Sequence, residues 1–294
     1  MTDGVYRSAE AAAAVAKQYR RVLDQWPVAK AERRLPTRQG PTFVVACGPE
    51  EAPPVVLLHG AQANSAAWML DIALWSTKFR LFAVDMIGEA GFSAPARLPL
   101  AGDSHALWLD DVFAGLELSR ATLVGTSLGG WLALDYASRR PAAVGALALI
   151  SPAGIGRQKN FLLKAAPLLL LGSWGRRRMR EMVFGPAPKT LPEAVQPLAD
   201  LMEGVGRAIK PRVVRIPRLT DAELGRLRMP ILAIVGGRDV LLESRETQER
   251  LQRAAPQAAE ICFLEEGYHF LPDQTARVMA FLERSVSSSQ DEAR

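Results

Sequence analysis

A serine flanked by glycines stands where an apolar run gives way to a helical pattern. Residues 125–129 read GTSLG, a G-x-S-x-G spacing preceded by ATLV and followed by GWLALDYASRRP. Where a strand turns sharply into a helix at such a motif, the serine projects above the sheet edge, and the glycines let backbone segments pass closely. The helix that follows directs backbone N–H groups and its positive dipole end at the same point. We predict that Ser127 is a nucleophile rather than a turn serine.

A serine hydroxyl is a weak nucleophile without a base, and the sequence offers three histidines. His105 falls in an expected helix before the serine, where we expect a surface or capping role. His59 ends an expected strand upstream of the serine. His269 lies in EEGYHFLPDQ, between the last expected strand and the final helix, at the carboxyl edge of the sheet where Ser127 must project. We predict His269 as the base.

The base needs a carboxylate that fixes its tautomer and stabilises the imidazolium. In AIVGGRDVLL, Asp239 follows a strand-ending Gly-Gly, again at the carboxyl edge, and the order serine, aspartate, histidine is the one expected for this elbow architecture. The segment SPAGIG, after another expected strand, offers no acid. We predict Asp239 as the acid. Three other carboxylates stay open as alternatives: Glu243, Glu265 and Glu266.

Attack on a carbonyl creates an oxyanion that needs two hydrogen-bond donors. The backbone N–H of Leu128, directly after the nucleophile, is the first candidate. The second is the N–H of Ala61 in HGAQANS, where Gly60 lets the chain turn. His59 then braces this loop. The side chain of Gln62 either contacts the substrate or stays in solvent.

Short apolar runs alternate with helical patterns, which indicates βαβ units and a mostly parallel sheet. Several runs are continuously apolar, as in strands that are covered on both faces. Expected strands occupy residues 42–48, 54–60, 80–86, 121–127, 146–152, 230–237 and 260–265. Expected helices occupy residues 66–78, 103–118, 128–140, 243–254 and 272–286, and an amphipathic helix begins near Ser8.

Composition excludes several classes of protein. The 294 residues, 49% hydrophobic and 23% charged, fit one large α/β domain or two modest ones. Cys47 and Cys262 fall in expected strands and are too few for a disulfide framework, so we expect two buried free thiols. Three histidines without a Cys/His cluster argue against a metal site. The N-terminus lacks the order of a signal peptide and the longest apolar run is far below the about 20 residues of a membrane span, so we expect a soluble, cytoplasmic protein.

Residues 155–228 interrupt the alternation and carry the positive charge. They hold 15 Lys/Arg and 6 Asp/Glu, a net charge of +9, which leaves −4 for the rest of a chain whose net charge is +5. We interpret them as an insertion of mostly helices. The basic run within it is either a solvated helix face or a means of steering an anionic substrate, and no nucleic-acid-binding module is present. Phe161 and Trp174, in its apolar stretch, either roof an apolar substrate pocket or pack the insertion onto the body.

The motifs HGAQANSAAW, VDMIGEAGFS, VGTSLGGWLALDYA, GGRD and GYHFLP, within residues 40–285, resemble those of the α/β-hydrolase superfamily, in particular its cap-bearing, esterase-like branch. DMIGEAGFS has one residue more than the commonest form of the family's turn, and the resemblance makes Asp85 and Ser93 structural. Tyr268 replaces the glycine that usually precedes the histidine. The resemblance implies an eight-stranded, mostly parallel sheet flanked by helices, with a helical cap after the sixth strand. The expected division is an N-terminal helix and lead-in (1–39), a core (40–154 and 229–286), a cap (155–228) and a flexible tail (287–294).

Together these features predict a serine hydrolase that cleaves a small-molecule carboxylic ester through an acyl-enzyme, without a cofactor. A lactonase or thioesterase differs only in the leaving group, and a carbon–carbon bond hydrolase uses the same triad on another substrate. A non-catalytic ligand receptor on this fold is the alternative from a different class, since fold does not settle function. The sequence says nothing about the oligomeric state.

Overall fold

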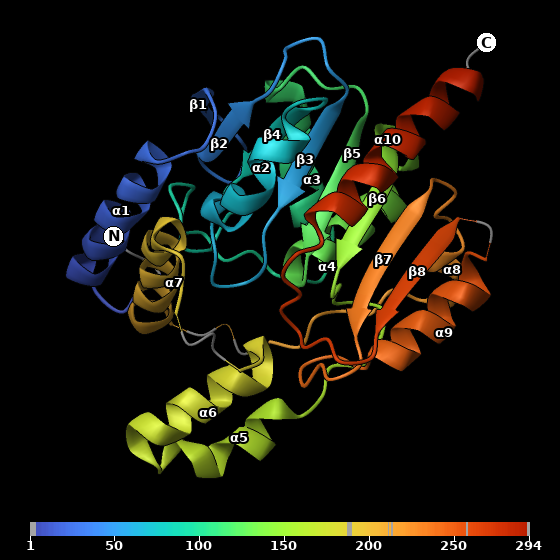
Figure 1. The fold of residues 1–294 in the computed structure, drawn as a ribbon. Coiled ribbons are helices and arrows are strands. Elements are labelled where there is room, and N and C mark those ends of the chain that lie inside the picture. The colour runs from blue at the N-terminus through green and yellow to red at the C-terminus, as the bar shows by residue number, and fades with distance from the viewer. Residues whose placement is uncertain (1–3, 187–189, 211, 213, 257, 293–294) are drawn as a thin grey trace.

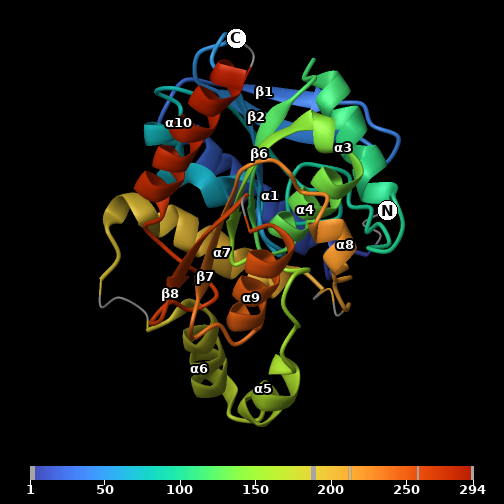
Figure 2. The ribbon, with the colours of Figure 1, turned by 90° about the vertical axis from the view of Figure 1, so that its right-hand side faces the viewer.

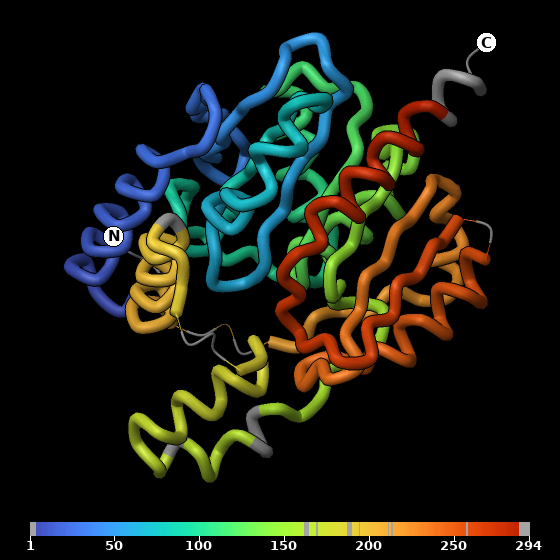
Figure 3. Tube along the Cα trace, in the orientation of Figure 1, coloured from blue at the N-terminus to red at the C-terminus, as the bar shows by residue number. Residues whose placement is uncertain are grey.

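The computed structural model describes residues 4–186, 190–210, 212, 214–256 and 258–292 (Figure 3). Figure 1 shows a central sheet with helices on both sides. The strands are β1 Lys30–Leu35, β2 Thr42–Cys47, β3 Pro54–Leu58, β4 Arg80–Val84, β5 Ala121–Thr126, β6 Val144–Ile150, β7 Ile231–Gly236 and β8 Ala259–Leu264. The α-helices are α1 Ala9–Asp24, α2 Met69–Trp75, α3 Ser104–Gly115, α4 Leu128–Arg139, α5 Phe161–Leu169, α6 Gly172–Phe184, α7 Gln196–Ala208, α8 Asp221–Leu224, α9 Ser244–Ala254 and α10 Thr275–Glu292. Short 3-10 helices lie at Ser65–Trp68, Pro141–Ala143 and Glu193–Val195.

In the described part of the chain the strands form one eight-stranded sheet of order β1-β2-β4-β3-β5-β6-β7-β8. Strand β2 is antiparallel to both of its neighbours, and the pairs from β4 to β8 are parallel. Strands β2 and β7 are buried at every residue, because helices cover both faces of the sheet. The predicted mostly parallel eight-stranded sheet is confirmed.

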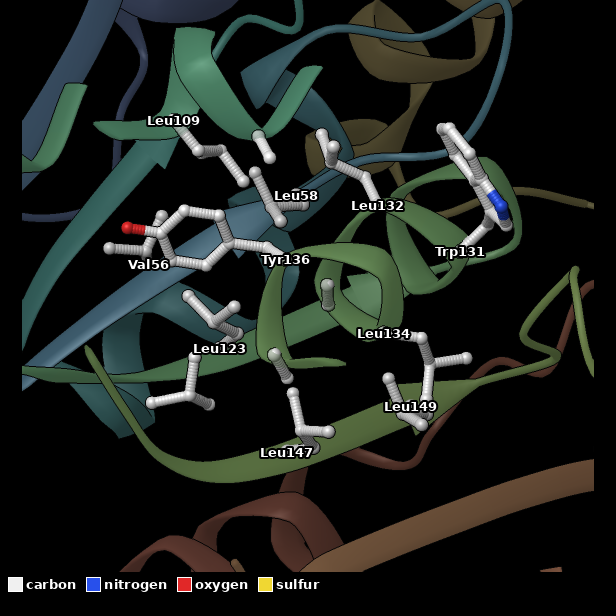
Figure 4. Close-up of a cluster of buried hydrophobic side chains, with 14 of the residues drawn as sticks. Val56, Leu58, Leu109, Leu123, Trp131, Leu132, Leu134, Tyr136, Leu147 and Leu149 are labelled. Carbon is white, nitrogen blue, oxygen red and sulfur yellow. The ribbon is translucent and has the colours of Figure 1, made fainter. Parts of the chain in front are cut away.

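Two apolar clusters hold the helices to the two faces of the sheet. One joins α3, α4 and α9 to one face, and the other joins α1, α2, α7 and α10 to the opposite face. Figure 4 shows the first cluster around α4, where aliphatic side chains of the strands meet the apolar side of the helix. Its labelled members are Val56, Leu58, Leu109, Leu123, Trp131, Leu132, Leu134, Tyr136, Leu147 and Leu149. This packing fixes α4, the helix that follows the predicted nucleophile.

The expected elements match the observed ones closely, with two differences. The seven expected strands correspond to β2–β8, with ends that differ by at most two residues. The helix expected near Ser8 is α1, and Ser8 caps it by accepting a hydrogen bond from the N–H of Ala11 at 3.1 Å. Strand β1, KAERRL, was not predicted, because its central residues are charged and exposed, as suits an edge strand. Helix α10 continues to Glu292, through most of the expected tail. Both cysteines are free, but Cys262 is half-buried rather than buried.

The segment 155–228 divides into parts with different environments. Helices α5 and α6 form a hairpin that projects from the body in two perpendicular views (Figures 1 and 2). Helix α7 instead packs on α1 through buried Leu198, Leu201 and Val205, and α8 lies beside α9 with Leu224 in the first cluster. Within the described ranges, no helix is long and apolar enough to cross a bilayer.

A wholly buried carboxylate, Asp85, ties α1 to the sheet. Its Oδ1 accepts hydrogen bonds from the Tyr19 hydroxyl at 2.8 Å and from the Ser65 hydroxyl at 2.7 Å. Its Oδ2 accepts from the N–H of Phe92 at 2.7 Å, and its backbone oxygen accepts from the Ser93 hydroxyl at 2.6 Å. These contacts satisfy the buried charge, and they agree with the structural role that the resemblance implied for Asp85 and Ser93.

A second carboxylate joins α2 to α10. The hydroxyl of Thr275 donates to Asp71 Oδ1 at 2.5 Å, and the indole of Trp75 donates to the backbone oxygen of Thr275 at 2.9 Å. Burial raises the pKa of Asp71 from 3.8 to about 6, and the Thr275 hydrogen bond offsets only part of that shift. The folded state therefore favours the protonated form of Asp71 more than the unfolded state does.

We predict that the unfolding free energy of Asp71→Asn increases relative to that of the wild type as pH rises. The pKa of Asp71 is higher in the folded state than in the unfolded state. The stability that the wild-type carboxyl contributes is therefore fully present below its pKa in the unfolded state, and it is lost as pH rises through about 6. The amide does not titrate, so between pH about 5 and pH about 7.5 the variant gains about 1.4 kcal/mol in unfolding free energy over wild type. Urea unfolding of both proteins at the two pH values measures this, and a difference that does not change with pH would contradict it.

Candidate functional site

The backbone at Ser127 adopts a conformation that L-residues rarely take. Its φ of 51° and ψ of −110° form the turn between β5 and α4. A Cβ atom on Gly129 would lie 2.1 Å from the Leu58 oxygen, and one on Gly125 would lie 2.6 Å from the Gly129 oxygen. The glycines are therefore required because the first turn of α4 touches the backbone of β3 and β5.

Neighbouring backbone groups stabilise this strained turn. The N–H of Ser127 donates to the Ile150 oxygen at 3.0 Å, and the Ser127 oxygen accepts from the N–H groups of Trp131 at 3.0 Å and Ala153 at 3.1 Å. A residue in a sparsely populated region persists only when its surroundings hold it in this way. The serine is thereby fixed to the end of β6 as well as to α4.

The structure brings the predicted nucleophile, base and acid together. His269 Nε2 lies 3.0 Å from Ser127 Oγ, and His269 Nδ1 lies 2.8 Å from Asp239 Oδ2. The other carboxylate oxygen accepts from the N–H groups of Leu241 at 2.7 Å and Leu242 at 3.0 Å. Asp239 is 2% exposed and fully hydrogen-bonded, so it holds the Nδ1–H tautomer and leaves Nε2 free to accept from the serine.

The three alternative acids point elsewhere. Glu243 lies 3.6 Å from the ammonium of Lys159, Glu265 pairs with Arg245 at 3.1 Å, and Glu266 pairs with Arg238. The ammonium of Lys159 also donates to the backbone oxygen of Asp239 at 2.6 Å. Of the four carboxylates considered from the sequence, Asp239 is the one that contacts the histidine.

The loop that carries His269 is held from two sides. The hydroxyl of buried Ser151 donates to the His269 backbone oxygen at 2.7 Å, and the N–H of Phe270 donates to the Val183 oxygen of α6 at 3.2 Å. Ser151 itself has a φ of 44°. The sequence does not predict this support, because a serine that bonds a distant backbone oxygen leaves no local pattern.

The loop after β3 lies against the nucleophile. A Cβ atom on Gly60 would be 3.6 Å from Ser127 Cβ. His59 is 1% exposed; its Nδ1 lies 2.8 Å from the Gly60 oxygen, and its Nε2 accepts from the N–H of Met86 at 2.9 Å. Burial lowers the pKa of His59. A neutral imidazole with its proton on Nδ1 satisfies both contacts, so the predicted bracing of this loop by His59 is confirmed.

The candidate oxyanion donors, Ala61 and Leu128, flank Ser127 on this loop and on α4. Within the described residues neither N–H donates to another protein group. Gln62 is exposed, has a φ of 60°, and donates its backbone N–H to Glu89 Oε2 at 2.8 Å. Glu89 was missed, although it lies in GEAGFS, the motif with one extra residue.

Glu89 is 3% exposed, and burial raises its pKa against the opposing effects of the Gln62 N–H and of two arginines, Arg212 and Arg97. Its Oε1 has no hydrogen-bond partner within the described residues. A buried carboxyl therefore lies directly behind the loop that carries Ala61.

Three other predicted residues lie elsewhere. His105 is not a surface residue: it is 5% exposed, packs edge-on against Trp131 with ring centroids 5.4 Å apart, and burial lowers its pKa to about 4. Phe161 begins α5 half-buried, and Trp174 is 54% exposed on α6. In the described ranges no group of three His, Cys, Asp or Glu side chains is placed to hold a metal.

We predict that Gly129→Ala disrupts the site and the fold together. The new Cβ must displace the backbone of β3, so we expect the unfolding free energy to fall by roughly 1–3 kcal/mol or more and ester turnover to be lost. Gly206→Ala in α7 is the matched control, because nothing lies within 4 Å of its Cβ position. Urea unfolding and an ester assay compare the variants, and equal stability of the two would contradict the close-contact explanation.

Two bacterial carboxylesterases are similar in sequence to this chain. The chain is 34% identical to the uncharacterized carboxylesterase nap of Bacillus subtilis strain 168 over 241 residues, which covers 81% of this chain and 80% of that protein. It is 32% identical to carboxylesterase YbfK of the same organism over 243 residues, or 81% of each chain.

Solved structures of carboxylesterases and the model of one protein family are also similar to this chain. The crystal structure of naproxen esterase (carboxylesterase NP) from Bacillus subtilis has a TM-score of 0.79 at 31% identity and covers 95% of this chain and 99% of that one. That of carboxylesterase CesB (YbfK) has a TM-score of 0.77 at 29% identity and covers 95% and 98%. The profile of the alpha/beta hydrolase family matches residues 55–281. The chain belongs to the alpha/beta hydrolase family.

Proposed function

We propose that this protein is a carboxylic-ester hydrolase that works through an acyl-enzyme on Ser127. The hydrogen-bonded series Ser127–His269–Asp239, with distances of 3.0 and 2.8 Å, is the observation that carries the proposal. Its carboxylesterase relatives, two of them above 30% identity, support ester hydrolysis independently of that geometry.

The geometry supports a defined sequence of proton transfers. His269 Nε2 takes the proton of Ser127 as Oγ attacks the ester carbonyl, and Asp239 stabilises the imidazolium through Nδ1. His269 then protonates the leaving alcohol, which breaks the ester bond and leaves an acyl-serine. Water, deprotonated by the same histidine, attacks the acyl group, and the carboxylic acid leaves with Ser127 restored.

The oxyanion of each tetrahedral intermediate lies between the N–H groups of Ala61 and Leu128 in this proposal. Both belong to segments that touch Ser127, and the Leu128 N–H is at the positive end of α4. The stabilisation is electrostatic and depends on donors fixed before the reaction begins. The bracing of Gly60 by His59 and of Gln62 by Glu89 supports that preorganisation.

The proposed function also covers the substrate, the cofactor, the location and the cap. The substrate is a small molecule, the reaction uses the chain's own side chains without a cofactor, and the location is cytoplasmic. The hairpin of α5 and α6 serves as the cap, with Phe161 and Trp174 as candidate substrate contacts. The solved structures of a meta-cleavage product hydrolase and of a 2-hydroxy-6-oxo-6-phenylhexa-2,4-dienoate hydrolase are 20% and 22% identical to this chain, so they show a shared fold alone.

We expect the wild-type protein to hydrolyse p-nitrophenyl esters across acetate, butyrate, octanoate and laurate, with the profile reporting the depth of the acyl pocket. Ser127→Ala and His269→Ala abolish turnover because they remove the nucleophile and the base. Asp239→Asn lowers kcat by about 10⁴-fold, the loss typical when the tautomer is wrong. Steady-state kinetics with each ester measures all four proteins.

A fluorophosphonate probe separates the remaining possibilities. Labelling of wild type but not of Ser127→Ala, with no turnover of any ester, would contradict the esterase proposal and favour another acyl or carbon–carbon substrate. Turnover that persists in Ser127→Ala would contradict the acyl-enzyme on this residue. Circular dichroism of each variant provides the control for folding.

We predict a positioning effect of Glu89 on the same reaction. Glu89→Ala leaves the Gln62 N–H without its buried acceptor, which typically costs about 1–3 kcal/mol, so kcat falls roughly 10- to 100-fold with little change in KM. Glu89→Gln retains an amide oxygen that accepts the same hydrogen bond and stays within about threefold of wild type. An equal loss in both variants would contradict the hydrogen-bond explanation.

A further inference from the structure

The turn of the α5–α6 hairpin exposes large apolar side chains. Leu170 is 89% exposed, Leu171 is 52% exposed and Trp174, in the first turn of α6, is 54% exposed. Figures 1 and 2 show this hairpin projecting from the rest of the molecule. Contiguous exposed apolar residues of this kind mark a surface that meets something other than water.

The same helix is strongly basic. Arg176, Arg177, Arg178 and Arg180 are all exposed, and Glu181 is the single acidic residue of α6, so four positive and one negative charge give a net charge of +3. Arg177 and Arg178 both lie near Glu181, at 3.5 and 3.3 Å. In the described part of the chain Arg176 and Arg180 have no carboxylate partner, so their charge is available to an anion.

The exposed face extends from the turn to the catalytic edge of the sheet. Arg176, Arg180 and Phe184 are spaced i, i+4, i+8 and share one side of α6. Arg178 lies on another side, where it lines a cavity with Arg238 and Tyr268 of the body. At the other end of the helix, Phe184 is 42% exposed and its ring lies 5.4 Å from that of Phe270, which is 43% exposed and follows His269 directly. The outer face of α6 thus joins an apolar turn, a basic middle and an aromatic pair beside the base.

We propose that the α5–α6 turn and the outer face of α6 dock on an anionic phospholipid surface. Leucine and tryptophan at a projecting turn suit shallow insertion at the level of the lipid headgroups, and the arginines above them meet the phosphates. The positive charge complements an anionic leaflet rather than a neutral one. This interaction does not depend on the esterase reaction.

A protein partner fits this surface less well. A stable protein interface involves about 20–30 residues on each side, whereas the large exposed apolar side chains of this surface are Leu170, Leu171 and Trp174 at the turn and Phe184 and Phe270 at its other end. A lipid surface deforms around a small projection, so a few inserted side chains plus several cations suffice. The occupant that fits this surface is therefore a membrane surface, and self-association is an outcome of the test.

The tryptophans make the test direct, because Trp174 is the exposed one of six. The other five are at most 7% exposed: Trp26, Trp68, Trp75, Trp108 and Trp131. On addition of phosphatidylcholine vesicles that contain phosphatidylglycerol, we expect a blue shift of tryptophan emission and co-sedimentation of the full-length protein. Vesicles of phosphatidylcholine alone produce little of either, and raising the salt from about 0.05 to about 0.5 M weakens binding because it screens the charges.

Paired variants separate the two contributions. Leu170→Ser with Leu171→Ser lowers partitioning to anionic vesicles at least tenfold, and Arg176→Ser with Arg180→Ser removes most of the preference for anionic over neutral vesicles. Leu70→Ser with Leu74→Ser is the matched control, since these α2 leucines are 58% and 42% exposed on another surface, and its binding equals wild type. Should the Leu170 and Leu171 variant fail to fold, the arginine pair and the wild-type lipid and salt dependence test the proposal.

Several results would overturn the proposal. One is wild-type protein that neither shifts nor sediments with anionic vesicles. Another is an α2 control that loses as much binding as the hairpin variant. A dimer in light scattering that the Leu170 and Leu171 variant disperses, without vesicle binding by either protein, would assign the surface to a second copy of the chain instead.

Discussion

The close contact between the first turn of α4 and the backbone of β3 and β5 is the constraint on which the site depends. It is possible only without a Cβ at Gly125 and Gly129, where one would lie 2.6 and 2.1 Å from backbone oxygens. The contact forces Ser127 into its left-handed conformation and brings the loop after β3 beside it. The apolar packing of α4 (Figure 4) holds the turn in place, since strain at one residue persists only where the surroundings over-determine it.

The other site residues come from loops that are joined to one another as well as to their own strands. Ser151, after β6, donates to the backbone of His269, after β8, and the N–H of Arg238, after β7, donates to the Gly267 oxygen at 2.8 Å. The glycine pair that ends β7 allows this, because a Cβ on Gly236 would lie 2.3 Å from the Tyr268 oxygen. Three successive strand ends therefore behave as one unit, and a shift in any of them moves the histidine relative to the serine.

The sequence predicts those site residues that are marked by a pattern of neighbouring residues. The elbow glycines and the strand-end positions of Asp239 and His269 are short-range patterns, so the residues that meet in the structure could be proposed from them. Glu89 could not, because its burial is produced by distant segments and a glutamate normally lies on the surface. Strand β1 was missed for a related reason: a charged edge strand lacks the apolar run that marks the central strands.

One departure from the family pattern has a structural explanation in the hairpin. Tyr268 stands where a glycine usually precedes the histidine, and its ring occupies the space beside Gly185, where a Cβ would lie 2.9 Å from the ring and φ is 82°. At the other end of the hairpin, the N–H of Lys159 donates to the Leu241 oxygen at 2.8 Å, next to the loop of Asp239. The hairpin is thus attached to the acid loop where it begins and to the histidine loop where it ends. The Tyr268 ring beside Gly185 and the hydrogen bond from the Phe270 N–H to the Val183 oxygen together make the second attachment, so a side chain at position 268 helps to hold α6 next to the loop of the base.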